Sequence, residues 1–149
     1  GLPTVFVLAR AGRFWREQGL KGKVSLIAAG KLLTPGDFLK AIALGADAVY
    51  VGTMALFATA HTQVLHSIPF EPPTQVAWYN GKSQNKFKIE EGAKYLANYL
   101  KSCTLEMTEG IKALGKTSLK EVNMEDLISL DPLITEATGI TPGYEPMPY

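Results

Sequence analysis

The sequence predicts a parallel α/β fold, and two observations support this prediction. Helix and strand patterns alternate over the first sixty residues, in the order helix, strand, helix, strand, helix. The two strand patterns, at residues 23–29 and 48–51, are short apolar runs that barely alternate with polar residues. Alternating helices and strands are typical of parallel sheets, and continuous apolar runs are typical of strands buried on both faces.

The first helix is expected at residues 4–17, where apolar residues recur at helical spacing before Gly19. Gly30 ends the first strand. The second helix has a clear start signal, with Thr34 as the N-cap, proline next, and an aspartate three residues after the cap. It is expected to stop at Gly45. The second strand then turns at Gly52 and Thr53 into a short helix over residues 54–60.

The composition changes after Ala60. Residues 61–86 hold three prolines and little periodicity, which predicts an irregular loop. One long helix follows at about 89–114 and is capped by Gly115. The last part of the chain is expected to form short helices and then an extended proline-rich arm over residues 141–149. The start signals of these helices are Thr117 or Ser118, Asn123 with Asp126 completing a capping box, and Asp131-Pro132.

Composition excludes several classes of function. The 149 residues are 46% hydrophobic, with 15 Lys+Arg against 14 Asp+Glu. A nucleic-acid-binding chain would show a clear excess of basic residues, and this chain does not. No apolar run approaches the roughly 20 residues that span a bilayer, and no signal peptide is visible, so we expect a cytoplasmic protein without a membrane segment. The single cysteine, Cys103, cannot form an internal disulfide or by itself a thiolate metal centre.

Cys103 falls on the apolar stripe of the long predicted helix, between Leu100 and Met107. This position favours a buried small hydrophobic residue over a reactive nucleophile. The full stripe consists of Ile89, Ala93, Leu96, Ala97, Leu100, Cys103, Met107, Ile111 and Leu114.

Two strand-to-helix turns carry the clearest chemical signal. Gly30-Lys31-Leu32 follows the first strand, and Gly52-Thr53 follows the second. Glycine permits close approach of the backbone to an oxygen-rich group, and the start of a helix adds unpaired N–H donors. Either turn alone could simply redirect the chain. Because turns after neighbouring parallel strands meet at one end of the sheet, the pair favours a phosphate site.

Residues 25–34 and 41–53 resemble the closing strands of FMN-binding (β/α)8 barrels, above all those of glutamate synthase and its relatives. Residues 1–4, 19–20 and 117–132 also resemble that family. Inosine monophosphate dehydrogenase and other phosphate-binding barrels share much of the motif region. The resemblance implies a partial TIM barrel: the last strand–helix units at residues 1–60, then a helical C-terminal extension at 61–149. A chain that opens on Gly1 rather than Met fits a start partway through a barrel.

The resemblance also implies a cofactor and its ligands. The backbone of Gly30, Lys31, Gly52 and Thr53 would hold the phosphate of FMN, with the Thr53 hydroxyl as a further donor. The family usually has a second glycine where Lys31 stands. We expect the Lys31 side chain to point away from the phosphate, since the cradle needs the amide; the alternative is a salt bridge to the phosphate.

Glutamate synthases follow the last strand with three cysteines that hold a [3Fe–4S] cluster. Residues 61–69 here contain no cysteine, so we expect no iron–sulfur cluster in this chain. His61 and His66 could be considered as metal ligands, but their spacing fits no common zinc signature. Hydrogen bonding within the loop is the favoured interpretation, and we expect no metal site.

The implied reaction is reduction of 2-iminoglutarate, formed from 2-oxoglutarate and ammonia or glutamine nitrogen, to glutamate. No catalytic residue is named, because the resemblance places those groups on strands outside this chain. Candidate partners are the small-molecule substrate, the missing N-terminal barrel part or a second copy, and an electron-donor protein. Two alternatives remain: a barrel of the inosine monophosphate dehydrogenase type that grips a phosphorylated substrate, and a non-catalytic fragment that self-associates through exposed strand edges.

Overall fold

The computed structural model describes residues 1–67 and 79–144, and the chain divides into two compact units. Unit 1 consists of Gly1–Tyr50 together with Glu106–Tyr149, and unit 2 is Val51–Leu105. The expected division of the family architecture at residue 60 stays a prediction.

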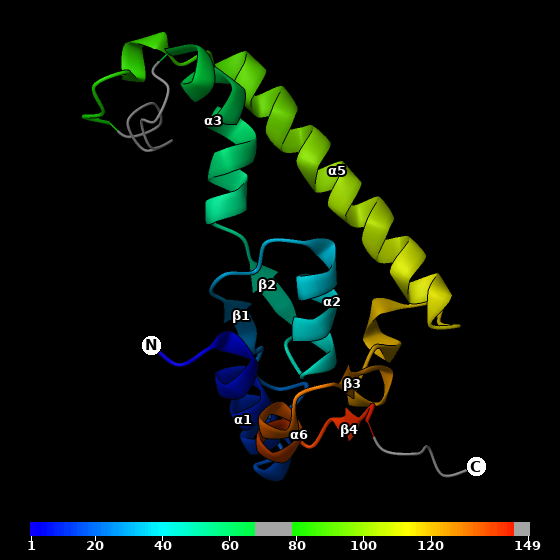
Figure 1. The fold of residues 1–149 in the computed structure, drawn as a ribbon. Helices are drawn as coiled ribbons and strands as arrows, with labels where there is room; N and C mark the ends of the chain where they lie inside the picture. The colour runs from blue at the N-terminus through cyan, green and yellow to red at the C-terminus, as the bar shows by residue number, and fades with distance from the viewer. Residues whose placement is uncertain (68–78, 145–149) are drawn as a thin grey trace. The chain divides into compact units, whose positions relative to one another are not determined.

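Unit 1 contains a parallel strand–helix–strand motif (Figure 1). Strand β1 (Ile27–Ala29) pairs with β2 (Ala48–Tyr50), so that Ile27 lies opposite Ala48 and Ala29 opposite Tyr50. Helix α2 (Pro35–Ala43) connects the two strands, and helix α1 (Thr4–Glu17) precedes them with the predicted bounds. The mixed α/β class is therefore confirmed, whereas the barrel stays a proposal.

Both strands are shorter and more exposed than predicted. Residues 23–26 lie outside β1, and residue 51 lies outside β2. Only Ala28 of β1 is buried, whereas Ile27 is 43% exposed and Tyr50 is 68% exposed. The prediction of strands buried on both faces is wrong for this chain, because the sheet that β1 and β2 form has only these two strands among the described residues.

The core of unit 1 forms where α1 and α2 pack on the sheet. A Cβ atom added to Gly12 of α1 would lie 2.5 Å from the carbonyl oxygen of Leu44, so a larger residue would push α1 away from the end of α2. Gly45, which ends α2 as predicted, has a φ of 116°, and a Cβ atom added to it would lie 3.3 Å from the Cα of Gly12. The buried apolar residues of this core are Leu8, Ala9, Ala28, Ala41, Leu44, Ala46 and Ile140.

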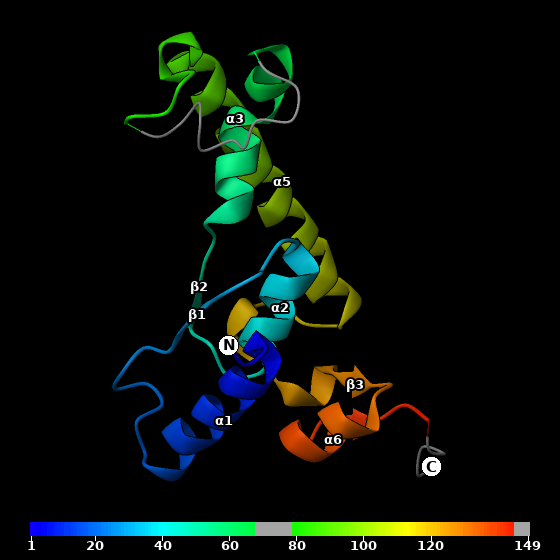
Figure 2. The ribbon, with the colours of Figure 1, turned by 60° about the vertical axis from the view of Figure 1, so that its left-hand side comes forward.

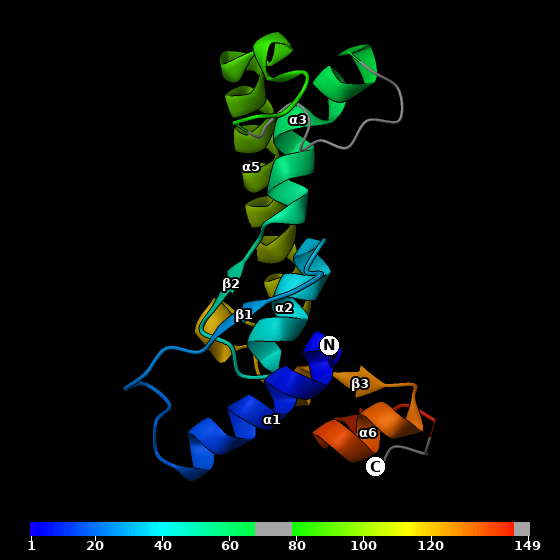
Figure 3. The ribbon, with the colours of Figure 1, turned by 90° about the vertical axis from the view of Figure 1, so that its left-hand side faces the viewer.

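Ile140 belongs to a C-terminal motif that the sequence analysis did not predict in full. Strands β3 (Ile128–Ser129) and β4 (Thr141–Pro142) pair in parallel around helix α6 (Pro132–Thr138). Figures 2 and 3 show α6 beside α1. Asp131 caps α6 by accepting hydrogen bonds from the N–H groups of Leu133 and Ile134, as its place before a proline predicts. The expected extended arm begins as β4, and residues 145–149 lie outside the described residues.

Unit 2 is built from helices. Helix α3 (Thr53–Ser67) runs seven residues beyond the predicted end at residue 60, so the prediction of an irregular loop from residue 61 is wrong. Residues 53–68 contain no proline or glycine, and the helix therefore continues past residue 60. Residues 68–78 of the predicted loop lie outside the described residues. A short 3-10 turn, η1 (Gln84–Lys86), then leads into helix α5 (Ile89–Ala113), whose last turns belong to unit 1.

One buried side chain connects α3 to the start of α5. The Gln63 amide accepts a hydrogen bond from the Lys88 N–H at 2.6 Å and donates to the Lys88 carbonyl at 3.1 Å. Close by, Ala60 is fully buried against Phe87, and Gly92 leaves room for Thr59 and Phe87. Gln63 thus satisfies both backbone groups of Lys88 just before α5 begins.

The predicted apolar stripe of α5 is only partly covered. Cys103 is buried, at 6% exposure, which confirms its expected role as a small core residue. Ile89 and Leu100 are 68% and 50% exposed and Leu114 is 40% exposed, so these positions of the stripe face solvent in the described chain. Within the described residues no helix is both long and apolar enough to cross a membrane.

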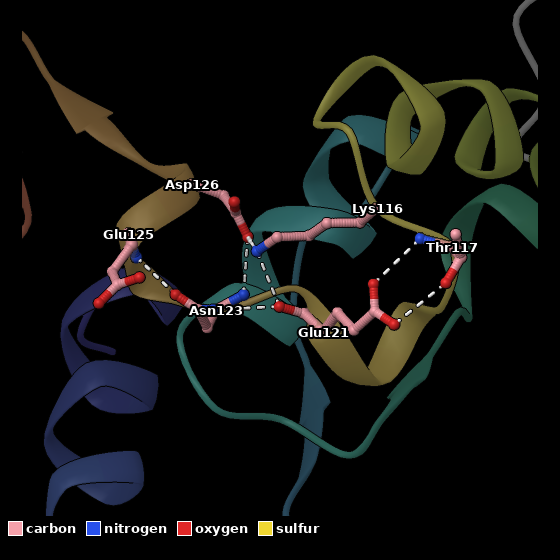
Figure 4. A network of polar contacts seen from close by, with 6 residues as sticks. All are labelled: Lys116, Thr117, Glu121, Asn123, Glu125 and Asp126. Atoms are coloured by element: carbon pink, nitrogen blue, oxygen red, sulfur yellow. Dashed lines mark hydrogen bonds and ion pairs between the residues drawn. The ribbon is translucent and has the colours of Figure 1, made fainter.

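The turns after α5 are held by a polar network around Lys116 (Figure 4). The Lys116 ammonium donates to the Asp126 carboxylate at 2.5 Å and to the Glu121 carbonyl at 2.8 Å. Thr117 donates its N–H and hydroxyl to the Glu121 carboxylate. The predicted starts at Ser118 and Asn123 are confirmed as caps, although the elements are single 3-10 turns: η2 (Leu119–Glu121) and η3 (Met124–Asp126).

Replacing Lys116 with methionine is expected to destabilise unit 1. The Lys116 and Asp126 side chains are only 19% and 11% exposed, so the substitution leaves a shielded carboxylate without its cation. We expect a loss of about 1–3 kcal/mol in the free energy of unfolding, measured by urea denaturation. Lys112→Met is the matched control, because the Lys112–Glu109 pair is more than 60% exposed on both sides and should change stability little. Equal effects of the two substitutions would contradict the assignment.

Stability is also expected to fall in acid. Hydrogen bonds from Lys21 to Asp47 and from Lys116 to Asp126 lower the pKa of each carboxyl below its ordinary value of 3.8. A carboxyl with a lowered pKa stabilises the fold above its unfolded pKa and loses that contribution as the pH falls through its folded pKa. Urea denaturation at a series of pH values should therefore show stability falling below pH 3.8, with a shallower fall in Lys116→Met. An unchanged slope in that variant would refute the prediction for Asp126.

Candidate functional site

The turn after β1 has an unusual backbone conformation. Gly30 has a φ of 115° and Lys31 a φ of 53°, and Lys31 is the one non-glycine residue with a positive φ in the described parts of the chain. The Thr4 hydroxyl donates a hydrogen bond to the Gly30 carbonyl at 2.7 Å, which ties this turn to the start of α1. The left-handed conformation at Lys31 explains why glycine suits this position.

A cavity of about 580 Å³ adjoins this turn within unit 1. Its lining includes Gly30, Lys31 and Thr4, together with the charged residues Asp37 and Lys40. Lys31 itself is exposed. A volume of this order is typical of small-molecule sites, and the turn that the sequence singled out lies in its wall.

The turn after β2 leads directly into α3 and belongs to unit 2. Gly52 and Thr53 are both exposed, and a Cβ atom added to Gly52 would meet nothing within 4 Å. No acidic residue stands in the first turn of α3. The start of this fifteen-residue helix therefore offers open space beside backbone N–H groups and a favourable helix dipole.

The start of α2 differs, because its own side chains occupy it. Thr34 and Asp37 form the predicted capping box, and the Asp37 carboxylate also accepts from the Leu33 N–H at 3.1 Å. Burial raises the pKa of Asp37, but hydrogen bonds from Leu33 and Thr34 outweigh it and hold the pKa below its ordinary value. This helix start already carries a negative charge and is a poor place for a phosphate.

The four predicted residues thus fall into two pairs. Gly30 and Lys31 follow β1, and Gly52 and Thr53 follow β2. The last residues of the two strands, Ala29 and Tyr50, lie opposite each other. The first pair belongs to unit 1 and the second to unit 2.

The histidines that the sequence raised as metal ligands are residues of α3. His61 is exposed and its ring lies 6.3 Å from that of Phe57, while the side chain of His66 lies outside the described residues. Among the residues that the structure describes, no three histidine, cysteine or acidic side chains gather as a metal site would require.

Sequence reasoning missed the role of Asp47. Its carboxylate accepts from the Lys21 ammonium at 2.5 Å and from the Leu26 N–H at 2.8 Å, and its own N–H donates to the Leu26 carbonyl at 2.7 Å. Asp47 therefore links the residues that precede β1 and β2. A single aspartate directly before an apolar run is the one available signal for this role.

Comparison with known proteins decides the family. The model described as "Conserved region in glutamate synthase" matches residues 1–117 of this chain. The chain belongs to this glutamate synthase family. The matched range contains both strand-to-helix turns described above, together with α1, α2, α3 and α5.

Curated members of the glutamate synthase family resemble the chain along most of its length. It is 33% identical over 122 residues to "Archaeal glutamate synthase [NADPH]" of Methanocaldococcus jannaschii, covering 82% of this chain and 24% of that protein. It is 31% identical over 149 residues to "Archaeal-type glutamate synthase [NADPH]" of Thermotoga neapolitana, covering 97% and 29%. The chain spans about a quarter to a third of the length of such relatives. No solved structure gives a significant match.

The backbone at Lys31 generates a prediction about stability. A left-handed conformation destabilises a non-glycine residue by about 1–2 kcal/mol. Glycine removes this strain, but its greater conformational entropy in the unfolded state offsets part of the gain. We expect Lys31→Gly to raise the free energy of unfolding by roughly 0.5–1 kcal/mol, measured by urea denaturation. Lys23→Gly is the control, since Lys23 is equally exposed but has no positive φ, and it should not be stabilising. A destabilised Lys31→Gly protein would contradict this interpretation.

Proposed function

We propose that this chain is part of a glutamate synthase-like, FMN-dependent oxidoreductase and that it holds the phosphate end of the cofactor. Family membership over residues 1–117 supports the activity, and the two turns after paired strands support the cofactor role. In the proposed reaction, 2-oxoglutarate and ammonia, supplied as such or from glutamine, lose water to form 2-iminoglutarate. Addition of a hydride and a proton then yields glutamate.

The residues at the start of α3 fit a phosphate group. The start of α3 has open space at Gly52, no acidic residue in its first turn, and the Thr53 hydroxyl as a further donor. At the first turn, Gly30 and Lys31 both have a positive φ and lie in the wall of a cavity that Asp37 and Lys40 also line, and the contribution proposed for them is that of their backbone amides. Backbone amides at glycine turns and helix starts are common phosphate ligands.

The role of this chain is binding and orientation. Bound FMN would supply the hydride, and Gly30, Lys31, Gly52 and Thr53 would fix its phosphate and so the position of the rest of the cofactor. Lys31 in this scheme contributes its amide, and its ammonium points away. The groups that contact the flavin ring and the substrate carboxylates are proposed to lie outside this chain, which spans only part of its relatives.

The source of electrons is proposed to be external to this chain. Residues 61–69 contain no cysteine, so we propose no iron–sulfur cluster here, and the electrons reach the flavin by another route. Several relatives carry NADPH in their names, which supports NADPH as the ultimate reductant, delivered by a partner protein or another part of the enzyme.

The fold proposed for the complete enzyme is the (β/α)8 barrel, of which β1 and β2 are closing strands. The exposed Ile27 and Tyr50 support this proposal, because a barrel buries both faces of every strand. The remaining strands would pair with the edges that β1 and β2 leave open within the described residues.

The test is FMN binding by a helix-start variant. Thr53→Glu places a carboxylate where the phosphate is proposed to sit, and repulsion together with the lost hydroxyl should weaken FMN binding about tenfold or more. The measurement is quenching of FMN fluorescence on titration with the purified full-length protein. Thr62→Glu is the matched control, because Thr62 is an exposed threonine of the same helix, away from its start.

If Thr53→Glu bound FMN with unchanged affinity, the start of α3 would not be part of the FMN site. Purified protein that binds no FMN at all, but binds inosine monophosphate, would instead favour a barrel acting on a phosphorylated substrate. Circular dichroism of both variants checks that α3 remains folded. A glutamate near a helix start is favourable for the helix itself, so loss of binding through unfolding is not expected.

A further inference from the structure

Unit 1 contains a second cavity, of about 690 Å³, at the opposite end of the strands from Gly30. Its lining includes Gly45, Ala46 and Asp47, the residues immediately before β2. Arg16, near the end of α1, and the 3-10 turns η2 and η3 complete the walls. The cavity is therefore formed by segments from the two ends of the sequence.

Three interactions fix these walls. The close approach of Gly12 to Leu44 and Gly45 sets the distance between α1 and the end of α2. The Lys21 ammonium bridges the Asp47 carboxylate and the Gly45 carbonyl, at 2.5 and 3.0 Å. On the far side, the network around Lys116 shown in Figure 4 holds η2 and η3. These contacts hold the walls of the cavity on both of its sides.

The charges that line the cavity are unevenly satisfied. Lys21 and Asp47 neutralise each other, whereas Arg16, Lys120 and Glu125 have no ion-pair partner among residues 1–67 and 79–144. Among the residues that the structure describes, the Arg16 guanidinium makes one hydrogen bond, to the Met124 sulfur at 3.9 Å, and a thioether is a weak acceptor. Arg16 therefore keeps most of its donors available to a ligand.

The rest of the lining is apolar. Ile42, Leu119, Val122 and Met124 contribute to the wall beside Arg16 and Lys120. A guanidinium next to hydrocarbon suits a molecule that has a carboxylate at one end and carbon atoms behind it, because the carboxylate matches the planar donors of arginine. A volume of 690 Å³ also exceeds what a bare inorganic ion would fill.

We propose that this cavity binds a small organic carboxylate through Arg16, with Lys120 as a second cationic contact. The site is separate from the proposed FMN site, since it adjoins the amino end of β2, whereas the Gly30 turn follows the carboxyl end of β1, the parallel neighbour of β2. It would give the enzyme an effector site for an organic acid.

The experiment uses the purified full-length protein and citrate as the probe, with isothermal titration calorimetry at constant ionic strength. Saturable binding with a Kd below about 1 mM is expected. Arg16→Gln should weaken it about tenfold or more, because a charged hydrogen-bonding partner is lost. Arg13→Gln is the matched control, since Arg13 is an exposed arginine of the same helix outside the cavity. FMN affinity should be unchanged in both variants, which separates this test from that of the proposed function.

A second variant tests the proposal independently, in case Arg16→Gln does not fold. Lys120→Glu lies on an exposed turn and should also weaken citrate binding, with an unchanged circular dichroism spectrum. Inorganic phosphate serves as a second probe. Equal affinity for phosphate and citrate would overturn the proposal, because the apolar wall would then contribute nothing. No saturable citrate binding, or equal loss in Arg16→Gln and Arg13→Gln, would overturn it as well.

Discussion

The arrangement of unit 1 depends on the hydrogen bonds of Asp47. Strands of three residues make few ladder hydrogen bonds, so β1 and β2 need a further constraint to hold their register. Asp47 supplies it by exchanging backbone and side-chain hydrogen bonds with Leu26, and Lys21 neutralises its charge. With this register fixed, the turns after Ala29 and Tyr50 emerge from neighbouring strand ends, and the walls of the second cavity meet at the other end of the sheet.

The sequence predicted those features that depend on a few neighbouring residues. The capping boxes at Thr34 and Asn123 and the helix end at Gly115 are set by local hydrogen bonds, and each lies where it was expected. Strand length and burial were predicted poorly, because an apolar run does not show how many strands pair in a sheet, and Ile27 is 43% exposed in the two-stranded sheet of the described residues. The extension of α3 was not predicted, because Pro69, Pro72 and Pro73 indicate a loop, whereas the residues before them contain no helix breaker and continue the helix to Ser67.

The two candidate sites also differ in how far the sequence predicts them. The turns at Gly30 and Gly52 are visible in the sequence because glycine at the end of an apolar run is a local signal. The conformation of Lys31 was not predictable, since the residue type alone argues against a positive φ. The second cavity could not be predicted from a sequence pattern. Its residues Arg16 and Met124 are 108 positions apart and come together only in the folded chain.

The direction of the chain explains why the two ends of the sheet carry different groups. In a parallel strand–helix–strand unit, the carboxyl ends of the strands lead towards helix starts, where backbone N–H groups and the helix dipole favour an anion. The amino ends follow helix ends, where carbonyl groups are exposed and the dipole is negative. Lys21 satisfies one such carbonyl, that of Gly45. An anion can bind at this end only through cationic side chains. Lys21 is paired with Asp47, so Arg16 and Lys120 are the cations in the cavity wall without an ion-pair partner among the described residues.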